Sequence, residues 1–268
     1  MPESDARREA ALSWLAPHAA ALDLDLSTLR PASADASFRR YFRLDAGGGS
    51  SLILMDAPPD KEDSSPFVHA RHVMADAGVH VPAIVREDLG AGFLLLEDFG
   101  DRTYLDALNA DSARPLYDDA TSTLVRLQAA SRPGVFPAYD RALLLRELEL
   151  FPTWYLERHK TETLTTTDRQ LLADAFETII ARTVGQAPVH VHRDYHSRNL
   201  MVLEGAANPG VIDFQDAVYG PITYDLVSLL KDAYIDWDEE RILDLAIRYW
   251  ERARKAGLPV SAGFDDFY

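Results

Sequence analysis

The sequence predicts an α+β fold with two lobes: a small N-terminal lobe built on an antiparallel sheet, and a larger, mainly helical C-terminal lobe. Short alternating strands joined by glycine turns are concentrated before Gly100. Apolar residues at helical spacing dominate after it. We therefore expect the chain to cross between the lobes near Gly100, with residues 1–100 in the first lobe and 101–268 in the second.

The first lobe is expected to combine two helices with alternating strands. In chain order, the patterns predict a helix to about residue 21, a turn of small residues entering a strand over 32–45, a glycine turn at 47–49, a return strand over 51–56, a helix over 65–77, and strands over 78–85 and 92–100. The last strand is an apolar run that ends in an acidic turn before Gly100.

The second lobe is expected to be helical on both sides of one short block of strands. The predicted helices cover 103–108, 113–131, 141–158, a segment capped by Asp168 and ending near residue 183, 224–230, and 238–256. Pro133 and Pro137 separate the second helix from the third, because proline cannot donate the N–H that a helix interior needs. Four apolar residues of the third helix recur at helical spacing and are predicted to be core: Leu144, Leu148, Phe151 and Tyr155.

The block of strands, residues 189–214, carries a set of polar residues at fixed places. Apolar runs alternate with a polar loop and a turn at 208–210, which predicts a strand–loop–strand–turn–strand unit. Within it, Asp194, Asn199 and Asp213 have the spacing of the catalytic loop of eukaryotic-type kinases. Phosphoryl transfer from ATP needs one carboxylate facing the attacking hydroxyl, and an amide oxygen and a second carboxylate to hold magnesium. Asp194 is therefore predicted to be the base or orienting group, and Asn199 and Asp213 the Mg²⁺ ligands.

The same loop also permits a zinc site, because His190, His192, Asp194 and His196 lie within seven residues. A catalytic zinc needs further ligands from other segments, and no histidine follows His196. We therefore favour structural roles for two of them: a half-buried strand position for His190, and for His192 a hydrogen bond to the backbone near the turn at Asp213. Asp225, in the first turn of a later helix, is predicted to tie down the catalytic loop.

The first hairpin is predicted to cover the phosphates of the nucleotide. Residues 34–38 stand where kinases have a glycine-rich loop, although they contain no glycine. Backbone N–H groups at Ser37 and Phe38 and the Ser37 hydroxyl are candidates for phosphate contacts, with Arg39 or Arg40 adding positive charge. Each arginine taken singly fits a solvated surface position equally well.

Two further segments are predicted to contact the nucleotide. Adenine is expected to stack between apolar residues near the end of the first lobe and to bond the backbone at Glu97, Asp98 and Phe99. Kinases carry a lysine on the return strand, paired with a glutamate of the next helix. Here the strand has Met55, and the helix over 65–77 has no glutamate. The sequence leaves open whether Lys61 or a hairpin arginine replaces that lysine, or whether magnesium and backbone suffice.

Composition limits the classes of function. With 47% hydrophobic and 26% charged residues the chain can bury a core, and with no cysteine it has neither disulfides nor thiolate chemistry. A net charge of −16 argues against binding nucleic acid. No signal peptide and no apolar run of membrane-spanning length is evident. We expect a cytoplasmic protein acting on a small molecule. The sequence does not indicate whether the protein is a monomer or an oligomer.

Taken together, these motifs resemble the aminoglycoside-phosphotransferase branch of the protein-kinase-like fold. The resemblance is closest to the anomeric N-acetylmuramate/N-acetylglucosamine kinases of bacterial cell-wall recycling, and the segments that carry it are 38–43, 54–59, 192–201 and 212–226. It implies transfer from ATP, with Mg²⁺, to the C1 hydroxyl of an amino sugar, giving an α-1-phosphate. It also implies that Met55 is normal for the subfamily. Chains of this kind usually continue past Tyr268, so the second lobe is expected to be shorter here.

Sugar contacts are expected on loops and helix ends that face the same opening. The candidates are His196, Arg198, Gln215, Asp232 and Tyr234. Arg198 or Lys231 is a candidate partner for a lactyl carboxylate, and each also fits a surface charge.

Two rival functions stay open at this point. Antibiotic phosphorylation uses the same scaffold, and net acidity would attract a polycationic aminoglycoside. A catalytically inactive nucleotide-binding module is favoured by the absent lysine–glutamate pair and opposed by the retained Asp194, Asn199 and Asp213.

Overall fold

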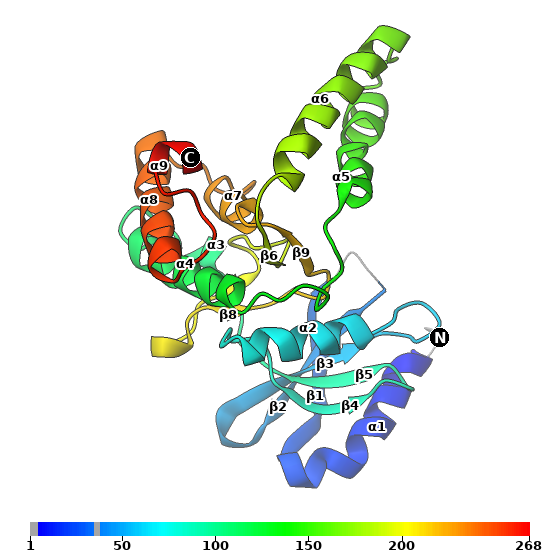
Figure 1. Cartoon of the computed structure of the whole chain (residues 1–268). Helices are drawn as coiled ribbons and strands as arrows, with labels where there is room; N and C mark the ends of the chain where they lie inside the picture. The colour runs from blue at the N-terminus through cyan, green and yellow to red at the C-terminus, as the bar shows by residue number, and fades with distance from the viewer. Residues whose placement is uncertain (1–4, 35–37) are drawn as a thin grey trace.

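The N-terminal lobe is built on a five-stranded antiparallel sheet with the strand order β1-β2-β3-β5-β4 (Figure 1). The structure is a computed structural model, and it describes residues 5–34 and 38–268. The strands are β1 (Leu24–Ala34), β2 (Arg40–Ala46), β3 (Ser50–Asp56), β4 (Ile84–Asp88) and β5 (Phe93–Glu97). A short turn of helix, η1 (Gly47–Gly49), joins β2 to β3 at the predicted glycine turn, where Gly48 and Gly49 have positive φ.

Both faces of this sheet are covered, which explains the continuous apolar run in β5. Successive strand residues point to opposite faces. Leu54 and Leu95 pack against α1 (Ala6–Leu22), whereas Met55 and Leu94 join the larger core that includes α2 (Ser65–Asp76) and the second lobe. The predicted hairpin and both predicted helices of this lobe are confirmed.

The sequence did not predict β1. The structure places residues 24–34 in an edge strand that pairs with β2 through two register shifts, so the start of the predicted turn, residues 32–34, belongs to this strand. Polar residues interrupt the apolar alternation of β1, and Pro31 cannot donate to a sheet hydrogen-bond ladder. An edge strand tolerates the polar residues and the proline, because the backbone groups on its outer side pair with no further strand.

The C-terminal lobe holds most of the helices. They are α3 (Tyr104–Ala107), α4 (Ala113–Ala129), α5 (Arg141–Leu148), the π-helix η2 (Phe151–His159), α6 (Thr166–Val184), α7 (Tyr224–Leu230), α8 (Glu239–Lys255) and α9 (Phe264–Phe267), with a short turn η3 (Gly205–Ala207). Thr165, and not Asp168, is the N-cap of α6, and the Asp168 side chain completes the capping box by accepting from the Thr165 N–H at 2.9 Å. In the described residues no helix is both long and apolar enough to cross a bilayer.

Helices α5, η2 and α6 form an arm that projects from this lobe (Figure 1). The sequence predicted one helix over 141–158 with a buried stripe. Leu144 is buried as predicted, but Phe151 and Tyr155 are 45% and 46% exposed, so the prediction that they are core is wrong. A projecting pair of helices can bury only the sides that face each other or the lobe. The two aromatic rings instead stack on one another with centroids 5.5 Å apart.

Four short strands form the part of the lobe that faces the sheet. β6 (Pro188–Val191) pairs with β9 (Val218–Pro221), and β7 (Leu200–Met201) pairs with β8 (Gly210–Val211). The predicted strand–loop–strand–turn–strand unit is thus confirmed as β6, β7 and β8. β9 lies after the predicted strand block over 189–214, in a segment where the sequence analysis predicted no strand.

Candidate active site

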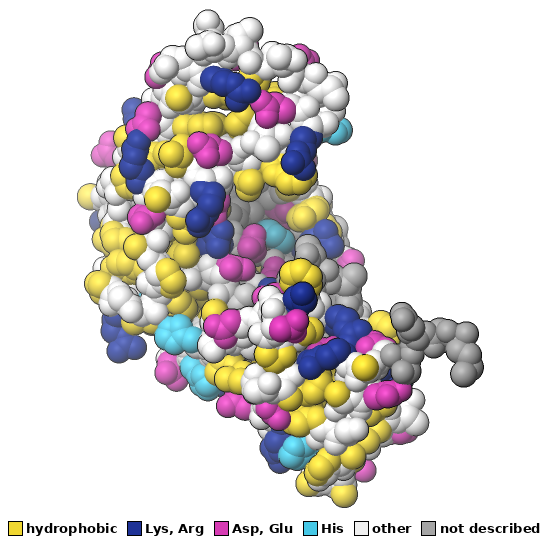
Figure 2. Space-filling model, turned by 90° about the vertical axis from the view of Figure 1, so that its right-hand side faces the viewer, with side chains coloured by type: hydrophobic (Ala, Val, Ile, Leu, Met, Phe, Trp, Pro, Cys, Tyr) yellow, Lys and Arg dark blue, Asp and Glu magenta, His cyan; other side chains and the backbone are white. Residues whose placement is uncertain are grey.

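A cavity of about 670 Å³ lies between the two lobes. Figure 2 shows the molecule hollowed there, with acidic side chains gathered in the hollow. Its lining comes from three places: the sheet of the first lobe, the crossing between the lobes, and the β7–β8 unit with its loops. The lining residues used below are Tyr41, Arg43, Ile53, Leu96, Glu97, Asp98, Phe99, Asp101, His196, Arg198, Asn199, Ile212, Asp213 and Tyr234.

The loop between β6 and β7 is anchored from beneath by Asp225 of α7. This carboxylate is fully buried and accepts hydrogen bonds from the backbone N–H groups of His192 (2.7 Å) and Arg193 (3.0 Å). Burial raises the pKa of Asp225 to about 7, and these two bonds act against that rise. Arg193 has a φ of 80°, in the left-handed region that favours glycine, so the anchor holds a strained backbone next to Asp194. The structural role predicted for Asp225 is confirmed.

Replacing Asp225 with alanine should destabilise the protein. The variant leaves the buried His192 N–H and the partly buried Arg193 N–H without an acceptor, and a buried donor left unpaired costs about 1–3 kcal/mol. Thermal and urea unfolding of the variant would measure the loss. Asp244→Ala is the matched control, since it removes an exposed carboxylate that pairs with Arg248 along α8. A variant at Asp225 as stable as that control would contradict the anchoring role.

The two histidines before the loop have structural contacts. His192 is buried and shares a hydrogen bond of 3.0 Å between its Nε2 and the Ile212 carbonyl, as predicted, while its Nδ1 accepts from the Asp194 N–H. Burial lowers the pKa of His192 to about 4, so its ring is neutral. His190 is more buried than predicted and accepts from the Arg132 N–H at 3.2 Å. In the described part of the chain no three His, Asp or Glu side chains gather as metal ligands, so the zinc hypothesis finds no support.

Asp194, Asn199 and Asp213 are brought together as the spacing predicted. The Asn199 side-chain N–H₂ donates to the Asp194 carbonyl at 3.0 Å and to Asp213 Oδ2 at 3.2 Å. Asp213 has a positive φ of 64°, which turns the chain sharply after β8. Asp194 is exposed and is not itself among the residues that line the cavity, whereas His196, Asn199 and Asp213 are. Partial desolvation and, second, the negative charge of Asp213 raise the pKa of Asp194.

These donors suit a hard divalent cation. With its N–H₂ group engaged, Asn199 has a side-chain oxygen that accepts no hydrogen bond from the described residues. Asp213 contributes carboxylate oxygens beside it, of which Oδ1 accepts from Gln215 Nε2 at 2.9 Å. Amide and carboxylate oxygens are the ligands that Mg²⁺ prefers, so the donor set fits that ion.

The loop between β6 and β7 is also tied to the projecting arm. The Arg193 guanidinium forms an ion pair with Glu147 of α5, and the Tyr139 hydroxyl donates to the same carboxylate. Arg193 Nη1 also donates to the Asp216 carbonyl at 3.3 Å. The base of the arm therefore holds the residue that precedes Asp194.

Only some of the residues that were predicted to bind the nucleotide line the cavity in the structure. Glu97, Asp98 and Phe99 line the cavity at the crossing between the lobes. Met55 is fully buried in the core and does not line the cavity. Ser37 lies outside the described residues.

The hairpin residues Phe38 and Arg39 lie near the segment over 60–63. Phe38 is 63% exposed, and Lys61 Nζ lies 6.0 Å from the centre of its ring. Arg39 is buried and pairs with Glu62 at 3.6 Å. Neither arginine of the pair Arg39 and Arg40 is among the residues that line the cavity.

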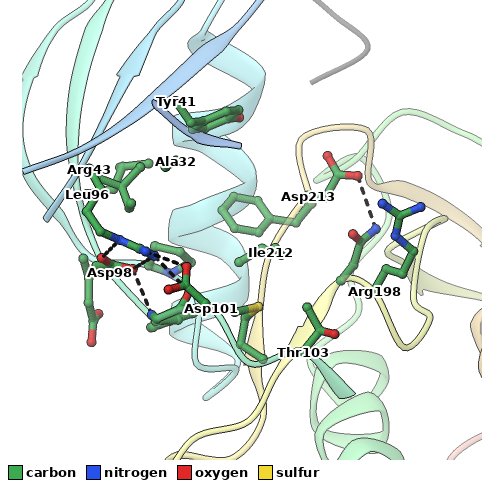
Figure 3. A pocket seen from close by; sticks show the side chains of 18 of the residues that line it. Ala32, Tyr41, Arg43, Leu96, Asp98, Asp101, Thr103, Arg198, Ile212 and Asp213 are labelled. Carbon is green, nitrogen blue, oxygen red and sulfur yellow. Dashed lines mark hydrogen bonds and ion pairs between the residues drawn. The ribbon is translucent and has the colours of Figure 1, made fainter. Parts of the chain in front are cut away.

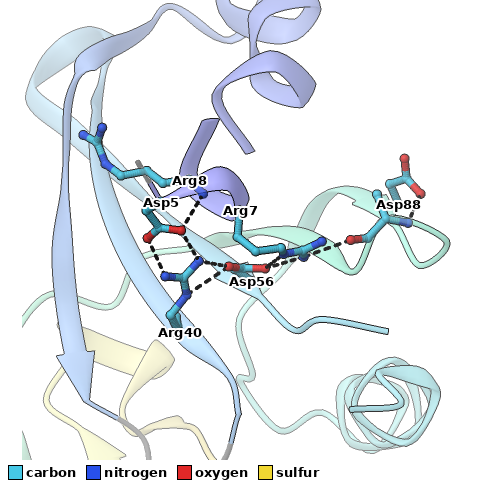
Figure 4. A network of polar contacts seen from close by, with 7 residues as sticks. Asp5, Arg7, Arg8, Arg40, Asp56 and Asp88 are labelled. Carbon is cyan, nitrogen blue, oxygen red and sulfur yellow. Dashed lines mark hydrogen bonds and ion pairs between the residues drawn. The ribbon is translucent and has the colours of Figure 1, made fainter. Parts of the chain in front are cut away.

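Arg40 takes part in a network at the N-terminal edge of the lobe (Figure 4). The buried carboxylate of Asp56 accepts from Arg40 Nη2 at 2.6 Å and from Arg7 Nε at 2.9 Å. Asp5, the N-cap of α1, also accepts from Arg40. The network ties α1 to the end of β3, and it already occupies the Arg40 guanidinium with two carboxylates.

An arginine of the first lobe that does line the cavity is Arg43, which the sequence analysis did not single out (Figure 3). Its guanidinium donates to both carboxylate oxygens of Asp98, to the Gly100 carbonyl at 3.1 Å and to Asp101. Although burial opposes the effect, hydrogen bonds from Arg43 and Ser51 hold the pKa of Asp98 below its ordinary value. The sequence did contain a signal for Arg43: strand alternation puts it on the same face of the hairpin as Tyr41, which also lines the cavity.

The predicted sugar contacts divide into two groups. His196, Arg198 and Tyr234 line the cavity. Gln215 bonds to Asp213, whereas Asp232 is buried and accepts from the N–H groups of Ser197 (2.9 Å) and Tyr234 (3.0 Å). In this structure Asp232 therefore holds the loops that carry the three lining residues.

Sequence comparison assigns the chain to a family. Residues 28–258 match the phosphotransferase enzyme family. A protein of Neisseria meningitidis serogroup B named N-acetylmuramate/N-acetylglucosamine kinase is 46% identical over 96% of this chain and 76% of its own length. Proteins of the same name from Pseudomonas putida and Pseudomonas aeruginosa are 45% and 49% identical, over 100% and 89% of this chain and 80% and 70% of theirs.

Solved structures of phosphotransferases share the fold. An ADP-bound aminoglycoside phosphotransferase, APH(2'')-Ib, superposes with a TM-score of 0.63 at 20% identity, covering 94% of this chain and 86% of the other. The macrolide 2'-phosphotransferase MphH of Brachybacterium faecium gives 0.64 at 17% identity, covering 97% and 86%. The predicted α+β kinase-like fold is thus confirmed. The chain belongs to the phosphotransferase enzyme family and, as its motifs predicted, is an enzyme of the kinase type.

Proposed function

We propose that this protein is an ATP-dependent sugar kinase that phosphorylates the C1 hydroxyl of N-acetylmuramate, N-acetylglucosamine or both. The observation that carries the proposal is the 45–49% identity to proteins named as kinases of these two sugars, over 89–100% of the chain. The product would be the α-1-phosphate, used in peptidoglycan recycling. We place the reaction in the cytoplasm, where ATP is available.

The cavity supports a division of labour between the lobes. In the proposal, residues 1–100 bind the nucleotide, with adenine between apolar residues such as Ile53, Leu96 and Ile212 and with hydrogen bonds to the backbone at 97–99. The phosphates would then extend toward Asp213. Residues 101–268 supply the catalytic loop and the sugar contacts. Asp194 is exposed two residues before the lining residue His196, so an acceptor held at that end of the cavity could reach its carboxylate.

The reaction needs positioning more than covalent chemistry from the protein. Mg²⁺, held by the oxygens of Asn199 and Asp213, would neutralise charge on the phosphates. Asp194 would orient the sugar hydroxyl and accept its proton as the oxygen attacks. Since an anomeric hydroxyl is more acidic than an ordinary alcohol, a carboxylate is a sufficient base, and the raised pKa of Asp194 strengthens it.

A substrate panel tests the proposal directly. ADP release would be measured with both amino sugars and with several aminoglycosides, and phosphorus NMR of the product would separate a C1 phosphate from a C6 phosphate by their couplings. We expect turnover of at least one amino sugar with phosphate at C1. Turnover of the antibiotics alone would refute the proposed substrate. Binding of Mg²⁺–ATP without turnover of any hydroxyl compound would instead support an inactive module.

A further inference from the structure

One wall of the cavity, formed by His196, Arg198 and Tyr234, has a cation with no anionic partner among the described residues. The Arg198 guanidinium lies over the Tyr234 ring, 4.9 Å from its centre, and the His196 ring packs edge-on against the same tyrosine at 5.5 Å. Arg198 is exposed and forms no ion pair with any described carboxylate. The other arginine that lines the cavity, Arg43, is paired with Asp98 and Asp101. Arg198 is therefore the guanidinium that a bound anion can reach.

This wall is held in place before any ligand binds. Asp232 accepts from the backbone N–H groups of Ser197 and Tyr234, which fixes the residue before Arg198 relative to the ring beneath it. Stacking on an aromatic face also restrains the planar guanidinium. A restrained arginine loses less entropy when it binds, which favours recognition of a planar anion through two parallel hydrogen bonds.

The position of Arg198 favours the acceptor over the nucleotide. Figure 3 shows Arg198 beside Asp213, on the side away from Asp98 and the crossing between the lobes. In the proposed function the nucleotide enters from that crossing and ends at Asp213, so Arg198 lies beyond the transferred group. The other cation suggested by the sequence, Lys231, pairs with Glu239 at 2.9 Å and does not line the cavity.

We infer that Arg198 binds the carboxylate of an acidic amino sugar and makes the enzyme select N-acetylmuramate over N-acetylglucosamine. The inference rests on the proposed function. These two sugars differ only in the lactyl ether at C3, which adds one carboxylate, so a single cation facing the acceptor is enough to separate them. A charge-assisted hydrogen bond to that carboxylate would raise the relative kcat/KM by about 10- to 100-fold.

Steady-state kinetics with both sugars tests the inference. In Arg198→Gln, the ratio of kcat/KM for N-acetylmuramate to that for N-acetylglucosamine should fall by about 10- to 100-fold. Arg198→Lys keeps the charge without the planar fork and should recover part of the ratio. Lys231→Gln is the matched control, because it removes an equal charge outside the cavity and should leave the ratio at the wild-type value.

Two results would overturn the inference. An unchanged ratio in Arg198→Gln would show that the carboxylate binds elsewhere. An equal loss with both sugars, together with a raised KM for ATP, would assign Arg198 to the transferred phosphate. If the wild type turned over neither sugar, the proposed function would fail by itself. Calorimetric binding of both sugars in the presence of a non-hydrolysable ATP analogue would then still test the role of Arg198. The wild type must bind N-acetylmuramate more tightly than N-acetylglucosamine, and Arg198→Gln must lose this difference.

Discussion

Replacing Asp194 with asparagine should nearly abolish phosphorylation while nucleotide binding persists. The substitution keeps the size of the side chain but removes its ability to accept a proton from the acceptor hydroxyl. Loss of such a group lowers kcat by about 10²- to 10⁴-fold. The Asn199 side chain holds the Asp194 main-chain oxygen and not its carboxylate, so the loop should keep its shape in the variant.

The measurement pairs ADP release with calorimetric binding of ATP in the presence of Mg²⁺. Asp216→Asn is a close control, because it removes another carboxylate near the same loop that has no bond to Asn199. We expect the control to turn over at close to the wild-type rate. Wild-type kcat in Asp194→Asn would remove this residue from the mechanism.

Replacing Asp213 with asparagine should abolish the dependence of nucleotide affinity on Mg²⁺. Asp213 supplies the only charged group of the proposed Asn199–Asp213 donor pair, and an amide is a weaker ligand for a hard cation. Because metal clamping of phosphates contributes several kcal/mol, affinity for ATP in Mg²⁺ should fall by about 100-fold or more.

Titration of ATP with and without Mg²⁺ checks this prediction. In the wild type, removing Mg²⁺ should weaken binding strongly, whereas in Asp213→Asn the two titrations should agree. The Asp216→Asn control should retain the wild-type difference. A variant at Asp213 that still gained affinity from Mg²⁺ would place the ion elsewhere.

Part of the fold was predictable because the evidence for it is local. The catalytic loop and its flanking strands occupy one continuous stretch, so the spacing of Asp194, Asn199 and Asp213 dictates that they meet once the short strands pair. Asp225 was likewise predictable in role, since the first turn of a helix is a common place for a carboxylate that accepts backbone N–H bonds. The prediction that Phe151 and Tyr155 are core was wrong because they lie on the projecting arm. Helical spacing alone does not reveal which side of a helix a neighbouring element covers.

By itself, the sequence determined the two-lobed fold, the strand–loop–strand unit that carries Asp194, Asn199 and Asp213, and the family, since periodicity and motif spacing act over a few residues. Only the tertiary structure decided which charges face the cavity. Arg43 meets Asp98 across 55 positions, and Arg193 meets Glu147 across 46, whereas Arg198 is left without a carboxylate partner among the described residues. The physical reason is that an ion pair depends on the distance between two side chains after folding, and no local pattern records that distance.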